Sequence, residues 1–266
     1  MGDLRAYGHL VRATARAQAQ YRVSFVTDLI GTSLVVTLDL VAILVFFRAT
    51  RTVGGFAVRE GFLMASMATC GFATADLIAG NIDKLSFHVR TGRLDILLVR
   101  PLGLLGQLVV EQFALRRVGR VTQGVLAYLI ALRWAHLAWT PAKVGLAVLA
   151  PLAATVFFVG LFVAGATVAF WWVDSSEFAS GFTYGGRDFT SYPLTVYSGA
   201  FRRLFGYGLG FGFVAYYPAL ILLDRPDPLG GPAWLGWCAP LVALAAAGIG
   251  ATIWRFGVRH YRSTGS

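Results

Sequence analysis

The chain has 266 residues, of which 57% are hydrophobic and only 14% are charged, and its formal net charge is +10. Soluble domains usually carry about 25% charged residues, so this composition argues against a soluble globular protein. The positive charge does not indicate nucleic-acid binding, because the arginines cluster beside hydrophobic runs, as they do in membrane proteins.

The first 22 residues predict an amphipathic helix that lies along the inner membrane surface. Their apolar side is formed by Leu4, Tyr7 and Val11, and their basic side by Arg5, Arg12 and Arg16. The arginines interrupt every apolar run in this segment, so it does not have the core of a signal peptide.

Apolar runs of about 20 residues follow, and they predict an all-α polytopic membrane protein with six transmembrane helices. We place the spans at 23–47, 56–80, 118–138, 143–172, 204–223 and 233–254. The single transmembrane domain, 1–266, then divides into the surface helix (1–22), spans one and two (23–80), a polar cytoplasmic segment (81–117), spans three and four (118–172), a cytoplasmic loop ending in a surface helix (173–203), spans five and six (204–254) and a basic cytoplasmic tail (255–266).

Six spans put both termini on one side of the membrane, and the basic residues indicate which side. Segments on the side of the termini hold 17 of the 23 lysines and arginines, and the opposite loops hold six. This bias predicts a multi-pass protein of the cytoplasmic (inner) membrane with both termini in the cytoplasm.

Four polar residues within the spans are candidates for a substrate pathway: Asp28, Thr32, Asp39 and Asp76. Ionisable groups within a bilayer are costly and often functional. The alternative is that Asp28 and Asp76 lie near the cytoplasmic interface and pair with arginines such as Arg22 or Arg90, which is the interpretation we favour for these two. For Asp39 both interpretations stay open.

The stretch from Arg90 to Pro101 is the most patterned polar segment of the chain. Leu94, Leu97 and Leu98 have the spacing of one apolar ridge on a short helix. Arg93 and Arg100 share a second face of this helix, and the acidic Asp95 lies between them in sequence. The helix can begin at Thr91 and Gly92, and Pro101 ends it. The pattern predicts either a helix on the membrane surface or a lever that docks on a partner protein.

This segment, with the surface helix and the six spans, resembles the ABC-2 type permeases, the membrane subunits of ATP-binding-cassette exporters of the type V kind. The matching residues are Gly92, Leu94, Asp95, Leu98 and Pro101. With Arg93, Arg100 and the later Tyr217-Pro218-Ala219, the chain is similar to a subfamily labelled multidrug or viologen exporter permeases. That label indicates a cationic and partly apolar substrate. A stripe of carboxylates along the first span, formed by Asp28 and Asp39, would suit the same kind of substrate.

The resemblance implies that residues 90–101 form a coupling helix within a coupling segment, 81–117. The leucine ridge would fill a groove of a separate ABC ATPase, and Arg93, Asp95 and Arg100 would fix its register at the polar rim. It also implies two copies of the ATPase, which hold ATP and Mg²⁺, a second permease of the same or a related chain, and no cofactor on this chain. Family members often have short re-entrant helices between the last two spans, and 224–232 leaves little room for them; whether they begin inside the predicted fifth span stays open.

Other classes of protein have less support. Neither Lys84 nor Lys143 stands in a phosphate-binding loop, so ATP hydrolysis requires another chain. The cysteines and histidines lack metal-ligand spacing. An ion-gradient-driven secondary transporter requires repeats with broken helices, and a membrane-embedded enzyme requires a catalytic motif; both remain as alternatives without such support.

Overall fold

The computed structural model describes residues 27, 30, 31, 33–35, 37, 38, 41, 42, 44, 45, 52–111 and 116–261. Apart from a short antiparallel hairpin, β1 (Thr52–Val53) with β2 (Phe56–Ala57), the regular elements of this part are helices, as predicted. The predicted surface helix, 1–22, lies outside the described residues, and the described positions between 27 and 45 are helical.

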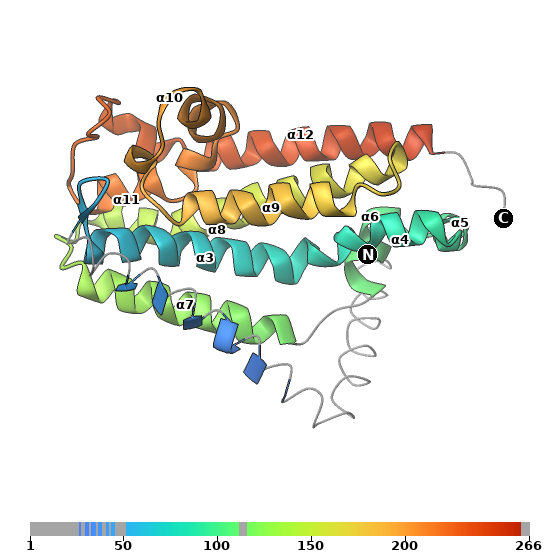
Figure 1. Cartoon of the computed structure of the whole chain (residues 1–266), viewed down its shortest axis with the longest axis horizontal. Coiled ribbons are helices and arrows are strands. Elements are labelled where there is room, and N and C mark those ends of the chain that lie inside the picture. Colours follow the sequence, from blue (N-terminus) through green and yellow to red (C-terminus); the bar gives the residue numbers. More distant parts are fainter. Residues whose placement is uncertain are drawn as a thin grey trace.

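Five helices lie alongside one another and form the body of the molecule (Figure 1). They are α3 (Val58–Ala79), α7 (Arg116–Trp134), α8 (Pro141–Thr167), α9 (Ser176–Thr190) and α12 (Ala239–His260). In the described part, three helical stretches are long and apolar enough to cross a membrane: Val58–Arg90, Pro141–Phe170 and Ala239–His260. A fourth membrane-crossing stretch exists only if Gly199–Gly208 and Phe211–Leu222 form one span despite a bend of 63° between them. The number of six spans therefore stays a prediction.

Helix α8 lies at the centre of the bundle. Residues in its first turn fix where it begins, and small residues further along let it pack closely against a neighbour. Thr140 caps it by accepting a hydrogen bond from the backbone N–H of Lys143, and Pro141 occupies the first turn. Further along, glycines bring α8 and α12 into backbone contact, since a Cβ atom on Gly250 would lie 2.5 Å from the carbonyl oxygen of Gly160. Small residues at such crossings are typical of helix packing in membranes.

The two ends of the bundle differ in structure. One end, which we call the α5 end, carries η1 (Gly80–Lys84), α4 (Leu85–Arg90), α5 (Arg93–Leu98), α6 (Leu104–Glu111) and η2 (Val168–Phe170). The other, which we call the hairpin end, carries the β-hairpin with η3 (Leu194–Val196), α10 (Gly199–Phe201), η4 (Arg202–Gly208), η5 (Phe211–Phe213), α11 (Tyr216–Leu222) and η6 (Ala233–Trp237). Helix α12 ends at the α5 end, where the hydroxyl group of Tyr261 donates to Asp95 (Figure 1).

The predicted fifth span, 204–223, is not one straight helix, and residues on either side of it contact the β-hairpin. The hydroxyl group of Thr195 donates to the carbonyl oxygen of Gly54 at 2.7 Å, and Arg225 donates to that of Gly55 at 2.6 Å. Gly210 adopts φ 83°, which interrupts the helix between η4 and η5. A bend of 63° separates Gly199–Gly208 from Phe211–Leu222, and the first of these helices begins before the predicted fifth span.

The loop predicted over 173–203 is also wrong in its structure, because α9 occupies most of it. At the α5 end Asp174 pairs with Arg90 at 3.4 Å, and Thr195 contacts the hairpin end, so this segment runs the length of α3. Small residues such as Ala179 and Thr183 are buried and let α9 pack against α8. Helix α12 likewise continues to His260, so residues 255–260 of the predicted tail are helical.

Candidate functional site

The predicted short helix in the segment 90–101 is present as α5. Thr91 terminates α4 by donating its hydroxyl group to the carbonyl oxygen of Phe87 at 2.8 Å. Gly92 follows with φ 67°, a left-handed conformation that glycine adopts without strain, and α5 begins at the next residue. It ends at Leu98, three residues before Pro101.

Two of the three leucines of the predicted ridge, Leu94 and Leu97, face this chain's own core, whereas Leu98 is exposed. Leu94 is 0% exposed and Leu97 is 3% exposed, and both belong to the main hydrophobic cluster. The interpretation that these two side chains fill a partner's groove is therefore wrong, because both are already buried here. The apolar side chains that α5 and its end present outward are Ile96, Leu98 and Val99, of which Val99 is 86% exposed. The ridge pattern did not identify Ile96 and Val99.

The charged residues of the segment also divide between inside and outside. Arg93 and Arg100 are exposed. Asp95 instead accepts a hydrogen bond from Tyr261, at 3.1 Å, so it binds the end of α12 rather than standing at an open rim. Burial and this hydrogen bond raise the pKa of Tyr261, so the phenol keeps its proton at neutral pH and remains the donor.

Gln107 on α6 holds the C-terminal end of α5 in place. Its side-chain amide donates to the carbonyl oxygen of Leu97 at 3.0 Å and to that of Leu102 at 2.9 Å. Gln107 is 4% exposed, so these two bonds are shielded from water. Gln107 therefore clamps α5, the following turn and α6 to one another.

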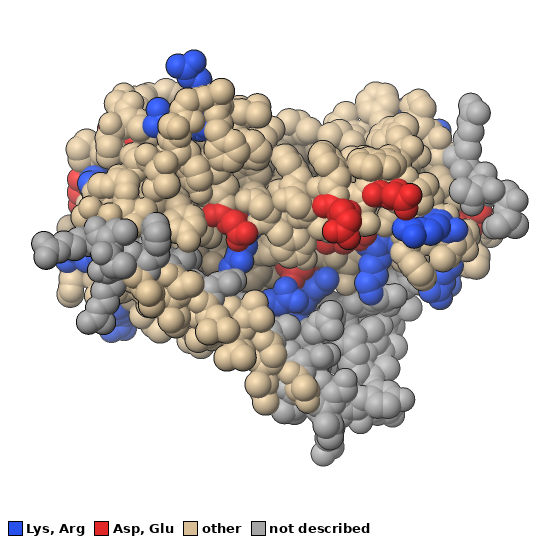
Figure 2. Space-filling view, in the orientation of Figure 1, with Lys and Arg blue, Asp and Glu red and all other residues tan. Residues whose placement is uncertain are grey.

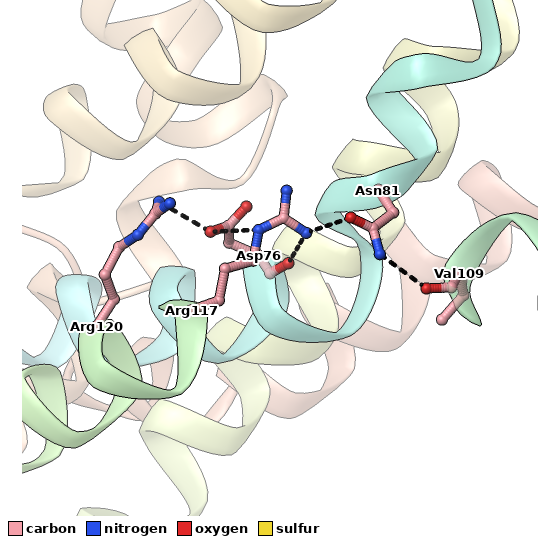
Figure 3. Close-up of polar contacts among 5 residues, drawn as sticks. All are labelled: Asp76, Asn81, Val109, Arg117 and Arg120. Carbon is pink, nitrogen blue, oxygen red and sulfur yellow. Dashed lines mark hydrogen bonds and ion pairs between the residues drawn. The ribbon is translucent and has the colours of Figure 1, made fainter. Parts of the chain in front are cut away.

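A buried charged cluster lies beside this segment, where α3 ends and α7 begins (Figure 3). Asp76 is fully buried, and its Oδ2 atom lies 3.0 Å from Nη1 of Arg120 and 3.4 Å from Nε of Arg117. Arg117 also donates through Nη1 to the backbone carbonyl of Asp76 at 3.0 Å and to Oδ1 of Asn81 at 2.9 Å. Asn81 in turn donates to the carbonyl oxygen of Val109 on α6 at 2.9 Å.

The arrangement stabilises buried charge, since a carboxylate removed from water requires a positive partner and hydrogen bonds. Of the two interpretations of Asp76, pairing with arginine agrees with the structure, but the partners are Arg117 and Arg120. The sequence contains a signal for them that we did not use: two arginines three residues apart at the start of an apolar run share one helix face. The other pathway candidates, Asp28, Thr32 and Asp39, lie outside the described residues.

The described residues contain no group of three His, Cys, Asp or Glu side chains that could hold a metal ion. Both cysteines are free. The chemistry of the site is thus that of charge pairing and hydrogen bonding around a short helix at one end of the bundle.

Comparison with protein families gave a match to a model described as ABC-2 family transporter protein, which covers residues 33–265. No curated protein and no solved structure matched the chain.

Proposed function

The chain belongs to the ABC-2 family of transporter proteins, and on this premise we propose that it is the membrane subunit of an ATP-binding-cassette exporter driven through α5. Members of this family are generally non-catalytic, multi-pass permeases that work with an ABC ATPase. The proposal adds where the ATPase docks, how the chain crosses the membrane and which face meets a second permease.

The exposed surface of α5 supports docking of the ATPase. Three apolar side chains, Ile96, Leu98 and Val99, project from the end of the bundle, and Arg93 and Arg100 lie beside them. An apolar centre with a charged rim is the usual composition of a protein–protein contact. The arginines provide the charge that aligns a partner and speeds its association.

We place the chain in the inner membrane, with its α5 end in the cytoplasm. We take α9 as the fifth crossing segment and 199–222 as re-entrant. The chain then still crosses the membrane six times, and both termini stay on the same side. The segments on the cytoplasmic side then hold fourteen lysines and arginines and the outer segments hold eight, with Arg187 inside α9. The positive-inside rule supports the same orientation as before.

The exposed side of α9, which lies beside the largely buried α3, supports a dimer of permeases. Figure 2 shows acidic and basic side chains in a band across the middle of the face that carries these two helices in Figure 1. Glu177 and Asp188 on α9 are exposed. Charged residues on a crossing helix face water or another protein rather than lipid. This face therefore borders the translocation pathway, with a second permease, of the same or a related chain, on its other side.

In this proposal the partner complex has two ATPase copies, and ATP and Mg²⁺ bind there. Transport runs outward. Asp28, Thr32 and Asp39 remain the proposed pathway residues of the first span, whereas Asp76 belongs to the buried cluster.

The docking of α5 is tested by co-purification with the cognate ABC ATPase and by ATP hydrolysis in lipid vesicles. Val99→Asp places a charge at the centre of the proposed contact, and we expect at least a tenfold loss of ATPase affinity. Val196→Asp, the same change at a 45% exposed position of the hairpin end, is the matched control and should bind like the wild type. Equal binding by Val99→Asp and the wild type would contradict docking at α5.

A further inference from the structure

Two sets of hydrogen bonds, joined through the backbone of α6, connect α5 with the ends of α3 and α7. The series starts at the carbonyl oxygen of Leu97 on α5, which accepts from Gln107 on α6. Two residues further along α6, the carbonyl oxygen of Val109 accepts from Asn81. Asn81 accepts from Arg117 on α7, and Arg117 binds both the backbone and the carboxylate of Asp76 on α3 (Figure 3).

The four side chains in this series are shielded from water. Gln107, Asn81, Asp76 and Arg117 are 4%, 5%, 0% and 9% exposed. When a buried donor or acceptor loses its partner, no water replaces it, so each link resists separation far more than an exposed hydrogen bond does. The series therefore joins α5 to α6, α3 and α7 through bonds that are costly to break.

The turn from α3 into η1 packs closely against the charged cluster. A Cβ atom at Gly80 would lie 2.2 Å from Oδ1 of Asp76 and 3.0 Å from the guanidinium carbon of Arg117. The turn from α3 into η1 thus lies directly against the charged pair, and a movement of η1 is passed to the pair by contact.

We propose that Gln107 and Asn81 are positioning residues for energy coupling, and that they transmit the movement of α5 to α3 and α7 through Arg117 and Asp76. The proposal rests on the proposed function, because it takes α5 as the point where the ATPase acts. It assigns to this chain a defined route between the ATPase contact and two helices of the bundle.

Two isosteric changes each remove one link. Gln107→Glu replaces the amide, which donates to both Leu97 and Leu102, by a carboxyl group that donates one hydrogen bond when protonated and none when ionised. Asn81→Asp removes the donor to Val109 and keeps an acceptor for Arg117. Gln123→Glu on α7, where the amide donates to the carbonyl oxygen of Ser33 at 3.2 Å, is the matched control outside the series.

The measurement is a distance between spin labels on exposed positions of two helices, Leu126→Cys on α7 and Leu244→Cys on α12, with Cys70 and Cys238 replaced by alanine. The labelled permease is diluted with unlabelled permease in vesicles that contain the cognate ATPase. The distance is recorded without nucleotide and after trapping with ATP and orthovanadate, and ATPase affinity and melting temperature are measured for each variant.

We expect the wild type and Gln123→Glu to change distance on trapping. Gln107→Glu and Asn81→Asp should bind the ATPase and hydrolyse ATP like the wild type but lose at least half of that change. A full distance change in both variants, or a loss of ATPase binding in both, overturns the proposal, since the latter shows a role in shaping α5 only. Failure of the wild type to bind the ATPase contradicts the proposed function itself and is seen before any variant is compared.

Discussion

At the scale of residues, the buried Asp76 carries the strongest electrostatic constraint in the described structure. Its carboxylate meets two guanidinium groups, and its side chain is 1% exposed. Asp76→Asn leaves both arginines without their counter-charge, which costs about 3–5 kcal/mol for a buried pair.

We expect this variant to have a clearly lower melting temperature in detergent. Asp174→Asn is the matched control, because the pair of Asp174 with Arg90 has side chains that are 79% and 59% exposed. Exposed pairs contribute about 0–1 kcal/mol, so the control should melt near the wild type. Equal melting temperatures for the two variants would contradict the assigned role of Asp76.

Gly80 gives a second prediction at this scale. Gly80→Ala inserts a methyl group against Asp76 and Arg117, and overpacking of this kind costs about 1–3 kcal/mol. Gly145→Ala on α8 has no atom within 4 Å of the added Cβ and should be neutral or stabilising by up to about 1 kcal/mol. The melting temperatures of both variants are compared with that of the wild type. A Gly80→Ala protein that melts like the wild type would show that the turn is less tightly packed than described.

The need of Asp76 for positive partners was predictable from the cost of a buried charge, but their identity was not. Arg117 and Arg120 are more than 40 positions away in sequence, and only the folded bundle brings them to the end of α3. Leu94 and Leu97 show a related limit. Their spacing defines an apolar ridge but does not tell whether the ridge faces the chain's own core or a partner.

At the scale of elements, the second, third, fourth and sixth predicted spans overlap α3, α7, α8 and α12. Of these, α3, α8 and α12 combine length with sustained hydropathy, whereas α7 is less apolar. The fifth predicted span is not one straight helix. Residues 204–223 are apolar enough to cross, yet Gly210 bends the chain and residues on either side of the segment bind the hairpin. Helix α9 is polar, and its small buried residues rather than its hydropathy secure its place against α8.

The proposed topology, in which 199–222 is re-entrant, predicts that Ser198 and Pro228 lie on the same, outer side of the membrane. Single cysteines at these exposed positions, without Cys70 and Cys238, should both react with an impermeant maleimide on intact cells. Val99→Cys at the α5 end should react only after the cells are opened. Protection of Ser198→Cys in intact cells would restore 204–223 as a crossing helix.

At the scale of the whole molecule, the two ends of the bundle differ: the α5 end exposes the proposed docking surface, and the hairpin end is held together by contacts between charged side chains. Arg225 joins Glu60 at 2.6 Å and lies 4.1 Å from the ring centre of Phe56, and Lys143 pairs with Asp224. These contacts fix the re-entrant segment to the starts of α3 and α8. In the proposed orientation the hairpin end faces outward, and we expect these contacts to change when substrate leaves.

The family could be predicted from the sequence because the short segment around Gly92–Asp95 occurs together with a recognisable order of apolar spans. The match to the family model agrees with this prediction. The exact surface offered to the ATPase was not accessible. It depends on which side of a six-residue helix the rest of the bundle covers.

The most direct test of the account places a photo-reactive amino acid at Val99 in a membrane that contains the cognate ATPase. Illumination should join the two chains there, whereas the same amino acid at Val196 of the hairpin end should give no such adduct. Cross-linking to the ATPase at Val99 alone is the result the account predicts. Its absence at Val99, or an equal yield at Val196, would contradict the claim that α5 receives the force of ATP hydrolysis.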